Sequence, residues 1–258
     1  MPRRRDVRRF GRGPYILGFE RDADRWGAGF PYDVPAVAAI EDLRLDAPVT
    51  LLAGDNGTGK STITEAVAEA MGFAGEGGEL ERPGELPPVV LPVMGGALDP
   101  VLGTRKPRNG YFLRAESFFN IAQFIDGGST FAPDLSLYGD VPLHGQSHGQ
   151  SFLALAANRF GGSSLYVLDE PEAALSVSGA LALLAIMVRA ARAGAQFLVA
   201  THSPVLLACP GARIYELDDG GLAERGYDDV EAVRLTRAFL DAPDRFLRAA
   251  LEEPGGSA

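Results

Sequence analysis

Residues 48–62 of the chain read PVTLLAGDNGTGKST. The run Pro48–Ala53 is short and apolar, carries β-branched residues and is bounded by proline and glycine, so it predicts a buried strand. From Gly59 to Met71, apolar side chains recur at helical spacing and the pattern stops at Gly72, which predicts a helix. A glycine-rich loop therefore leads directly from a strand into a helix.

The joining loop, Gly54–Ser61, matches the P-loop pattern GxxxxGK[ST] in the strand–loop–helix setting that the pattern requires. Its glycines let backbone N–H groups converge on phosphate oxygens, and the helix N-terminus adds its positive end. Lys60 would reach the β- and γ-phosphates of ATP, and the Ser61 hydroxyl would ligate Mg²⁺. A chance glycine-rich turn ending in Lys-Ser is a poor alternative, because Lys106 is the only other lysine. We expect these residues to contact the nucleotide: Gly54, Asn56, Gly57, Thr58, Gly59, Lys60, Ser61 and Thr62.

A second buried strand is predicted at Leu165–Leu168, and two acids, Asp169 and Glu170, follow it. Ligands of α/β sheets bind at the carboxyl ends of the strands. Asp169 would hold Mg²⁺, directly or through water, as the Walker B acid does, and Glu170 would polarise the attacking water. The alternative is a strand that simply meets solvent at two acids. This pair gains weight from the P-loop that precedes it.

Two further segments offer groups to an anion. Ser147, His148 and Gly149 lead into a predicted helix, Gln150–Phe160, and with Gln150 they supply a hydroxyl, a residue without Cβ and a helix N-terminus. The alternative here is a polar helix cap.

The second segment is an apolar strand, Gln196–Ala200, followed by Thr201 and His202. A single histidine at a strand end is more often a surface residue, yet the chain has only three histidines.

The order of these motifs resembles that of the ABC ATPase superfamily over most of residues 45–205. The segment at Ser147 is similar to the LSGGQ signature, with His148 in place of the first glycine. The resemblance implies that Ser147, Gly149 and Gln150 face the γ-phosphate held by the other subunit of a head-to-tail homodimer. It also implies that His202 is the switch histidine, which bonds the γ-phosphate and takes part in catalysis with Glu170.

Within that superfamily the chain looks more like the soluble predicted AAA/ABC ATPases related to RecF-like and SMC-like heads. Ser176 stands where transporter subunits usually have Asp, and Pro204 follows the His-Ser pair. The Q-loop glutamine expected after the strand Tyr111–Ala115 is replaced by Glu116, which would serve as an oxygen ligand of Mg²⁺. The aromatic residue that stacks on adenine stays open among Tyr15, Phe30 and Tyr32.

Strands and helices alternate along the chain, which predicts an α/β P-loop NTPase fold with a mainly parallel sheet flanked by helices. We expect a basic arm at 1–12 and one ATPase domain at 13–258, in which 75–160 form an insertion and a small subdomain carrying the signature. Gly75–Asn109 reads as irregular, with at most one strand near Val89–Val93. The remaining predicted elements are strands at Tyr15–Glu20 and Arg213–Leu217, helices at Ser117–Ile125 and Ser178–Arg192, a loop at 126–148, and one or two amphipathic helices over Val230–Leu251.

Composition limits the function classes. The 258 residues carry a net charge of −10, which argues against a surface built for nucleic acid, although six arginines crowd the first 12 residues. Those arginines could touch phosphates, but a solvated tail is the favoured reading. One cysteine, Cys209, fits a reducing compartment, and the longest apolar run, Ala180–Val188, is too short to span a bilayer. We therefore expect a soluble cytoplasmic protein that does not contact the membrane.

Three functions follow from these patterns. The first is an enzyme, an ATPase that hydrolyses Mg·ATP as a homodimer closed by nucleotide. The second is an ATP-gated binding module, whose partner protein or nucleic acid would dock on the arginine-rich arm or on the 75–109 insertion. The third is the ATP-binding subunit of a transporter, against which Ser176 and the missing Q-loop glutamine both count.

Overall fold

The computed structural model describes residues 14–73, 77–79, 94–114 and 148–251. Its strands are β1 (Ile16–Arg21), β2 (Val49–Gly54), β3 (Gly78–Glu79), β4 (Leu98–Leu102), β5 (Asn109–Arg114), β6 (Ser164–Asp169), β7 (Gln196–Ala200), β8 (Arg213–Asp218) and β9 (Gly221–Arg225). Its helices are α1 (Pro35–Ala38), α2 (Lys60–Ala70), α4 (His148–Arg159), α5 (Val177–Arg192), α6 (Pro204–Leu207), α7 (Glu231–Asp241) and α8 (Pro243–Leu251). Short 3-10 turns lie at η2 (Ile40–Asp42), η3 (Met94–Ala97) and η6 (Tyr227–Asp229).

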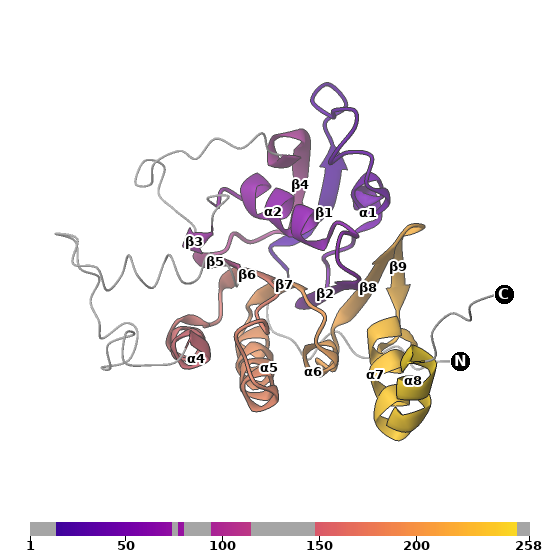
Figure 1. Ribbon diagram of the computed structural model, residues 1–258. Helices are drawn as coiled ribbons and strands as arrows, with labels where there is room; N and C mark the ends of the chain where they lie inside the picture. Colours follow the sequence, from indigo (N-terminus) through magenta and orange to yellow (C-terminus); the bar gives the residue numbers. More distant parts are fainter. Residues whose placement is uncertain (1–13, 74–76, 80–93, 115–147, 252–258) are drawn as a thin grey trace, which may run out of the picture.

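The main sheet has seven strands in the order β3-β5-β6-β7-β2-β8-β9 (Figure 1). The strands from β5 to β8 run parallel, whereas β3 and β9 pair antiparallel at the two edges. A separate antiparallel pair joins β1 to β4. The mainly parallel α/β sheet predicted from the alternation of elements is confirmed. Because β6, β7 and β2 are parallel neighbours, their carboxyl ends lie side by side at one edge of the sheet.

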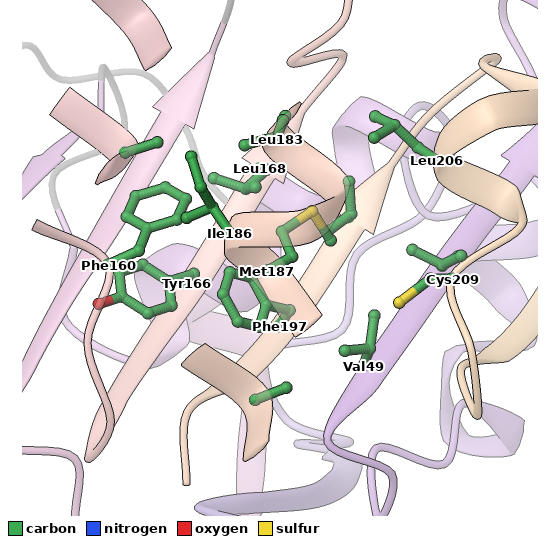
Figure 2. Close-up of a cluster of buried hydrophobic side chains, with 14 of the residues drawn as sticks. Val49, Phe160, Tyr166, Leu168, Leu183, Ile186, Met187, Phe197, Leu206 and Cys209 are labelled. Carbon is green, nitrogen blue, oxygen red and sulfur yellow. The ribbon is translucent and has the colours of Figure 1, made fainter. Parts of the chain in front are cut away.

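Helices cover both faces of the sheet, which explains why every residue of β6 is buried. Leu165 and Val167 belong to an apolar cluster that includes buried residues of α1 and α2, whereas Tyr166 and Leu168 belong to a cluster with α4, α5 and α6. Figure 2 shows the second cluster, in which Tyr166 and Leu168 lie among side chains of α5 and β7. The two clusters hold the strands rigidly, so the loops at their carboxyl ends start from fixed positions.

The connection between α4 and β6 is closed by Tyr166. Its ring packs against those of Phe160, at a centroid distance of 4.3 Å, and Phe197, at 4.7 Å. Its hydroxyl donates to the carbonyl of Arg159 at 3.0 Å and accepts from the N–H of Gly161 at 2.8 Å. Burial raises the pKa of this phenol, so it remains a neutral donor. One side chain thus fixes the end of α4 against the sheet.

Most of the predicted elements within the described residues are confirmed, with boundaries shifted by at most two residues. The segment Gly75–Asn109 differs from its prediction, because β3, η3 and β4 lie in it. Pro100 hides β4 in the sequence, since proline is disfavoured inside sheets; β4 tolerates it as one strand of an isolated pair, opposite Phe19. The C-terminal segment forms two helices, which part at Ala242. The predictions for Val89–Val93, Ser117–Ile125 and 126–147 fall outside the described residues.

No helix in the described part of the chain is both long and apolar enough to cross a bilayer.

Candidate functional site

The P-loop runs from the end of β2 to the start of α2. Gly57 and Gly59 have φ of 83° and 97°, a backbone conformation that side chains with a Cβ rarely adopt. A Cβ on Gly59 would also stand 2.9 Å from Cγ1 of Val34. The turn is closed by Thr58, whose hydroxyl donates to the carbonyl of Asp55 at 2.8 Å. Positive φ therefore explains both Gly57 and Gly59, and close packing adds a second reason for Gly59. The contact of this loop with phosphate stays a prediction.

Lys60 lies over this loop. Its Nζ donates to the carbonyls of Gly54, at 2.9 Å, and Asp55, at 2.8 Å. Burial lowers the pKa of the ammonium, and the nearby carboxylates of Glu170 and Asp169 oppose that shift. The Lys60 ammonium therefore interacts electrostatically with the two acids at the end of β6.

Ser61 and Asp169 meet across the site. The Ser61 hydroxyl donates to Oδ1 of Asp169 at 3.1 Å, joining the first turn of α2 to the end of β6. Burial raises the pKa of the Asp169 carboxyl to about 6, although Arg114 and the bond from Ser61 act in the opposite direction. A hydroxyl and a carboxylate are the hard oxygen donors that Mg²⁺ prefers, so the pair fits the metal expected here. No cluster of three or more His, Cys, Asp or Glu suited to a metal occurs among the residues that the structure describes.

Arg114 is a member of the site that the sequence reasoning did not identify. It ends β5 opposite Asp169 in the strand register. Its Nη1 lies 2.6 Å from Oε1 of Glu65, on α2, and its Nε lies 3.7 Å from Oδ2 of Asp169. The available signal was a charged residue at the carboxyl end of a predicted strand, the same signal that identified Asp169.

Glu170 and His202 come together because β6 and β7 are neighbours, with Asp169 opposite Ala200. Oε1 of Glu170 lies 3.2 Å from Nε2 of His202. This distance is short enough for an ion pair. The two atoms do not form a hydrogen bond, and Nε2 has no hydrogen-bond partner among the described residues. Glu170 has a φ of 48°, uncommon for a residue with a side chain, and its N–H donates to Ala200.

Glu172 is a second residue of the site that the sequence patterns do not single out. Its carboxylate accepts hydrogen bonds from Thr201, His202 and Ser203, in the loop that follows β7. Nothing in the spacing of the sequence shows that this acid turns toward the histidine segment.

The signature segment is described in part. Gly149 and Gln150 lie in the first turn of α4, whereas Ser147 lies outside the described residues, as does Glu116. A Cβ on Gly149 would stand 2.5 Å from the carbonyl oxygen of Ala174, in the turn after β6. Packing within the chain is thus one reason for glycine here. The contact of this segment with a second subunit stays a prediction.

The three aromatic candidates for adenine differ in their surroundings. Tyr15 is a core residue: it is 1% exposed, its N–H donates to Gln196 at 2.7 Å and its hydroxyl donates to Gly194 at 2.8 Å. Tyr32 packs edge-on against Trp26 at 5.1 Å. Phe30 is 81% exposed, and Val34 of the same loop contacts the P-loop at Gly59. Phe30 is therefore the candidate most open to a base.

The geometry defines the class of site: a P-loop, an Asp-Glu pair and a histidine gathered at the carboxyl edge of a parallel sheet. Comparison with known proteins agrees. The family described as "AAA domain, putative AbiEii toxin, Type IV TA system" matches residues 121–208. The cytochrome c biogenesis ATP-binding export protein CcmA of Nitrobacter winogradskyi is 28% identical over 170 residues, which are 63% of this chain and 82% of that protein.

Two solved structures are also similar. The SMC head domain from Thermotoga maritima has a TM-score of 0.40 and 19% identity, and the match covers 71% of this chain and 91% of that one. The cbiO1 protein from Clostridium perfringens, part of the ABC transporter complex cbiONQ, has a TM-score of 0.44 and 14% identity, with coverage of 92% and 100%. These scores are low, so the fold assignment rests on the sheet order and the motif positions.

The chain thus resembles the ABC-type P-loop ATPases, as its motifs predicted, and the sequence matches confirm that resemblance.

Proposed function

We propose that the chain is a Mg²⁺-dependent ATPase that binds ATP at Gly54–Thr62 and hydrolyses it in a head-to-tail homodimer. One observation carries this proposal. The P-loop, the Asp169-Glu170 pair and His202 lie at the carboxyl ends of three adjacent parallel strands, with Ser61 bonded to Asp169 at 3.1 Å and His202 beside Glu170 at 3.2 Å. These residues are far apart in the sequence and meet at one edge of the sheet. The packing of the fold does not need two acids and a histidine there, which favours a functional role.

The residues divide the work of hydrolysis between them. Lys60 and the loop N–H groups hold the β- and γ-phosphates. Glu170 orients a water and accepts its proton as the water oxygen bonds to the γ-phosphorus and the bond to the β–γ bridging oxygen breaks, giving ADP and phosphate. His202 donates a hydrogen bond to the γ-phosphate. Ser61 and Asp169 would hold Mg²⁺, which when bound neutralises charge on the phosphate oxygens.

The homodimer is the part of the proposal that comes from the resemblance. In it, Ser147, Gly149 and Gln150 of one subunit complete the γ-phosphate site of the other. Gly149 and Gln150 lie at the N-terminus of a helix of 12 residues, which suits an anion. We place the protein in the cytosol, in line with its single buried cysteine.

A second function is favoured by the curated relative, whose printed name is that of an ATP-binding export protein. A transporter subunit would purify with a membrane protein. Ser176 counts against it at the sequence level, although here its hydroxyl accepts from the N–H of Gly179 at 3.2 Å as the cap of α5. An ATPase that acts alone and an ATP-gated module that acts on DNA are distinguished by phosphate release measured with and without DNA. Stimulation of phosphate release by DNA favours the module.

The two lysines of the chain provide a matched test of the nucleotide site. Lys60→Ala removes the cation that lies over the P-loop, so calorimetric titration with Mg·ATP should give no measurable binding. Lys106→Ala removes an exposed lysine and should bind like the wild type. Wild-type affinity in the Lys60→Ala protein would show that ATP phosphates bind elsewhere.

A further inference from the structure

The carboxylate of Glu172 joins the turn after β6 to the loop after β7. Its Oε1 accepts three hydrogen bonds: from the Thr201 hydroxyl at 2.6 Å, from the N–H of His202 at 2.6 Å and from the N–H of Ser203 at 3.0 Å. Bonds to a carboxylate at these lengths are charge-assisted and roughly twice as strong as bonds between neutral groups. One oxygen atom therefore fixes three consecutive residues of the neighbouring loop.

That loop carries the histidine of the site. The N–H of Thr201, which donates to the carbonyl of Leu52 at 3.0 Å, still bonds to the sheet. The next two N–H groups, of His202 and Ser203, turn to Glu172 instead. The position of the His202 backbone is thus set by Glu172, and that backbone position leaves Nε2 3.2 Å from Glu170.

The two oxygens of Glu172 have different surroundings. Oε1 receives all three bonds, whereas Oε2 is buried and has no hydrogen-bond partner among the described residues. What the loop requires is therefore one acceptor oxygen. A glutamine would keep that oxygen with weaker, neutral bonds, and a methionine of similar length would remove it.

We propose that Glu172 is a positioning residue for His202, which acts through the backbone and does not touch the nucleotide. This inference rests on the proposed function, in which His202 bonds the γ-phosphate. A histidine held by its own N–H cannot drift with the loop, so its ring starts each turnover close to Glu170. Misplacing such a group by about 1 Å can cost on the order of 10²-fold in rate.

The alternative is that Glu172 has only a structural role. Ser203 caps the short helix α6, since its hydroxyl accepts from the N–H of Leu206 at 3.4 Å. Glu172 could serve only to hold the start of this helix. In that case its loss would lower stability, and any effect on turnover would not depend on His202.

A double-mutant cycle distinguishes the two roles. We expect Glu172→Met to lower kcat for ATP about 10- to 100-fold with little change in KM, and Glu172→Gln to lose less. In a His202→Ala background, Glu172→Met should cause no further loss, because its effect passes through the histidine. Losses that multiply in the double variant would overturn the inference.

Thermal unfolding without nucleotide provides the control for folding. If Glu172→Met does not fold, Thr201→Val leaves the acid in place and removes one of its three bonds, together with the bond from the Ser203 N–H to the Thr201 hydroxyl at 3.0 Å. Its smaller loss of kcat should disappear in the His202→Ala background, and persistence there would contradict the inference. A wild-type protein without turnover would refute the proposed function and the inference with it. Turnover with independent losses would refute only the inference.

Discussion

The ionised carboxylate of Asp169, which the site needs, lowers the stability of the fold. The carboxyl is almost fully buried, and burial raises its pKa to about 6 from its ordinary value of 3.8. The folded state therefore binds a proton more tightly than the unfolded state. Protonation stabilises the fold fully below pH 4, and this contribution is lost as the pH rises through 6. At neutral pH the ionised carboxylate costs up to about 3 kcal/mol.

This cost leads to a prediction for Asp169→Asn. The amide keeps an acceptor for Ser61 and carries no charge, so in metal-free buffer at pH 7.5 the variant should be more stable than the wild type by up to about 3 kcal/mol. The difference should shrink toward pH 4. Urea unfolding across this pH range measures it, and Mg·ATP should raise the melting temperature of the wild type only. A variant less stable at every pH would contradict the burial argument.

Single residues also show what the sequence could predict. Lys60, Ser61 and Asp169 were found because a motif ties them to a strand end, and the structure brings them together. Arg114 and Glu172 make their contacts with residues at the ends of neighbouring strands, Asp169 and His202. The order of the strands in the sheet decides such contacts, and that order is not encoded locally. The roles of all these residues remain predictions.

The N-terminus of α4 shows the constraints at the level of an element. It packs against the turn after β6 so closely that a Cβ on Gly149 would approach the carbonyl of Ala174 to 2.5 Å. Backbone cannot yield as a flexible side chain can. The helix that begins at the proposed signature segment is therefore fixed to the turn that carries Glu170 and Glu172, and motion of either would move the other.

Gly149→Ala tests this contact. Alanine favours helix by about 1 kcal/mol over glycine, but overpacking against backbone costs about 1–3 kcal/mol, so we expect a net loss of stability or a displaced α4. Gly161→Ala is the matched control, because a Cβ there meets nothing within 4 Å, and its effect should stay within about 0.5 kcal/mol. Urea unfolding compares the two. Equal stabilities would show that α4 and the turn are not tightly packed.

The sequence predicted helices and strands correctly where their pattern of apolar residues matches their burial in the fold. The central strands are apolar because both of their faces are covered, and this pattern is visible in the sequence. The strands β4 and β9 are half exposed and less apolar, so their pairing with β1 and β8 came only from the structure.

At the scale of the whole molecule, the sheet order explains why distant motifs make one site. Placing β7 between β6 and β2 brings the P-loop to one side of the histidine strand and the acids to the other. Nothing in the order of motifs along the chain requires this arrangement. The histidine loop thus becomes the central element, held by Glu172 and facing Glu170.

Phosphate release by Glu170→Gln shows whether this edge of the sheet hydrolyses ATP. The amide cannot accept the proton of the attacking water, so turnover should fall on the order of 10²–10⁴-fold while calorimetry shows wild-type affinity for Mg·ATP. The ATP-bound variant should also accumulate as a dimer on gel filtration. Turnover equal to that of the wild type would contradict the claim and move the catalytic base away from Glu170.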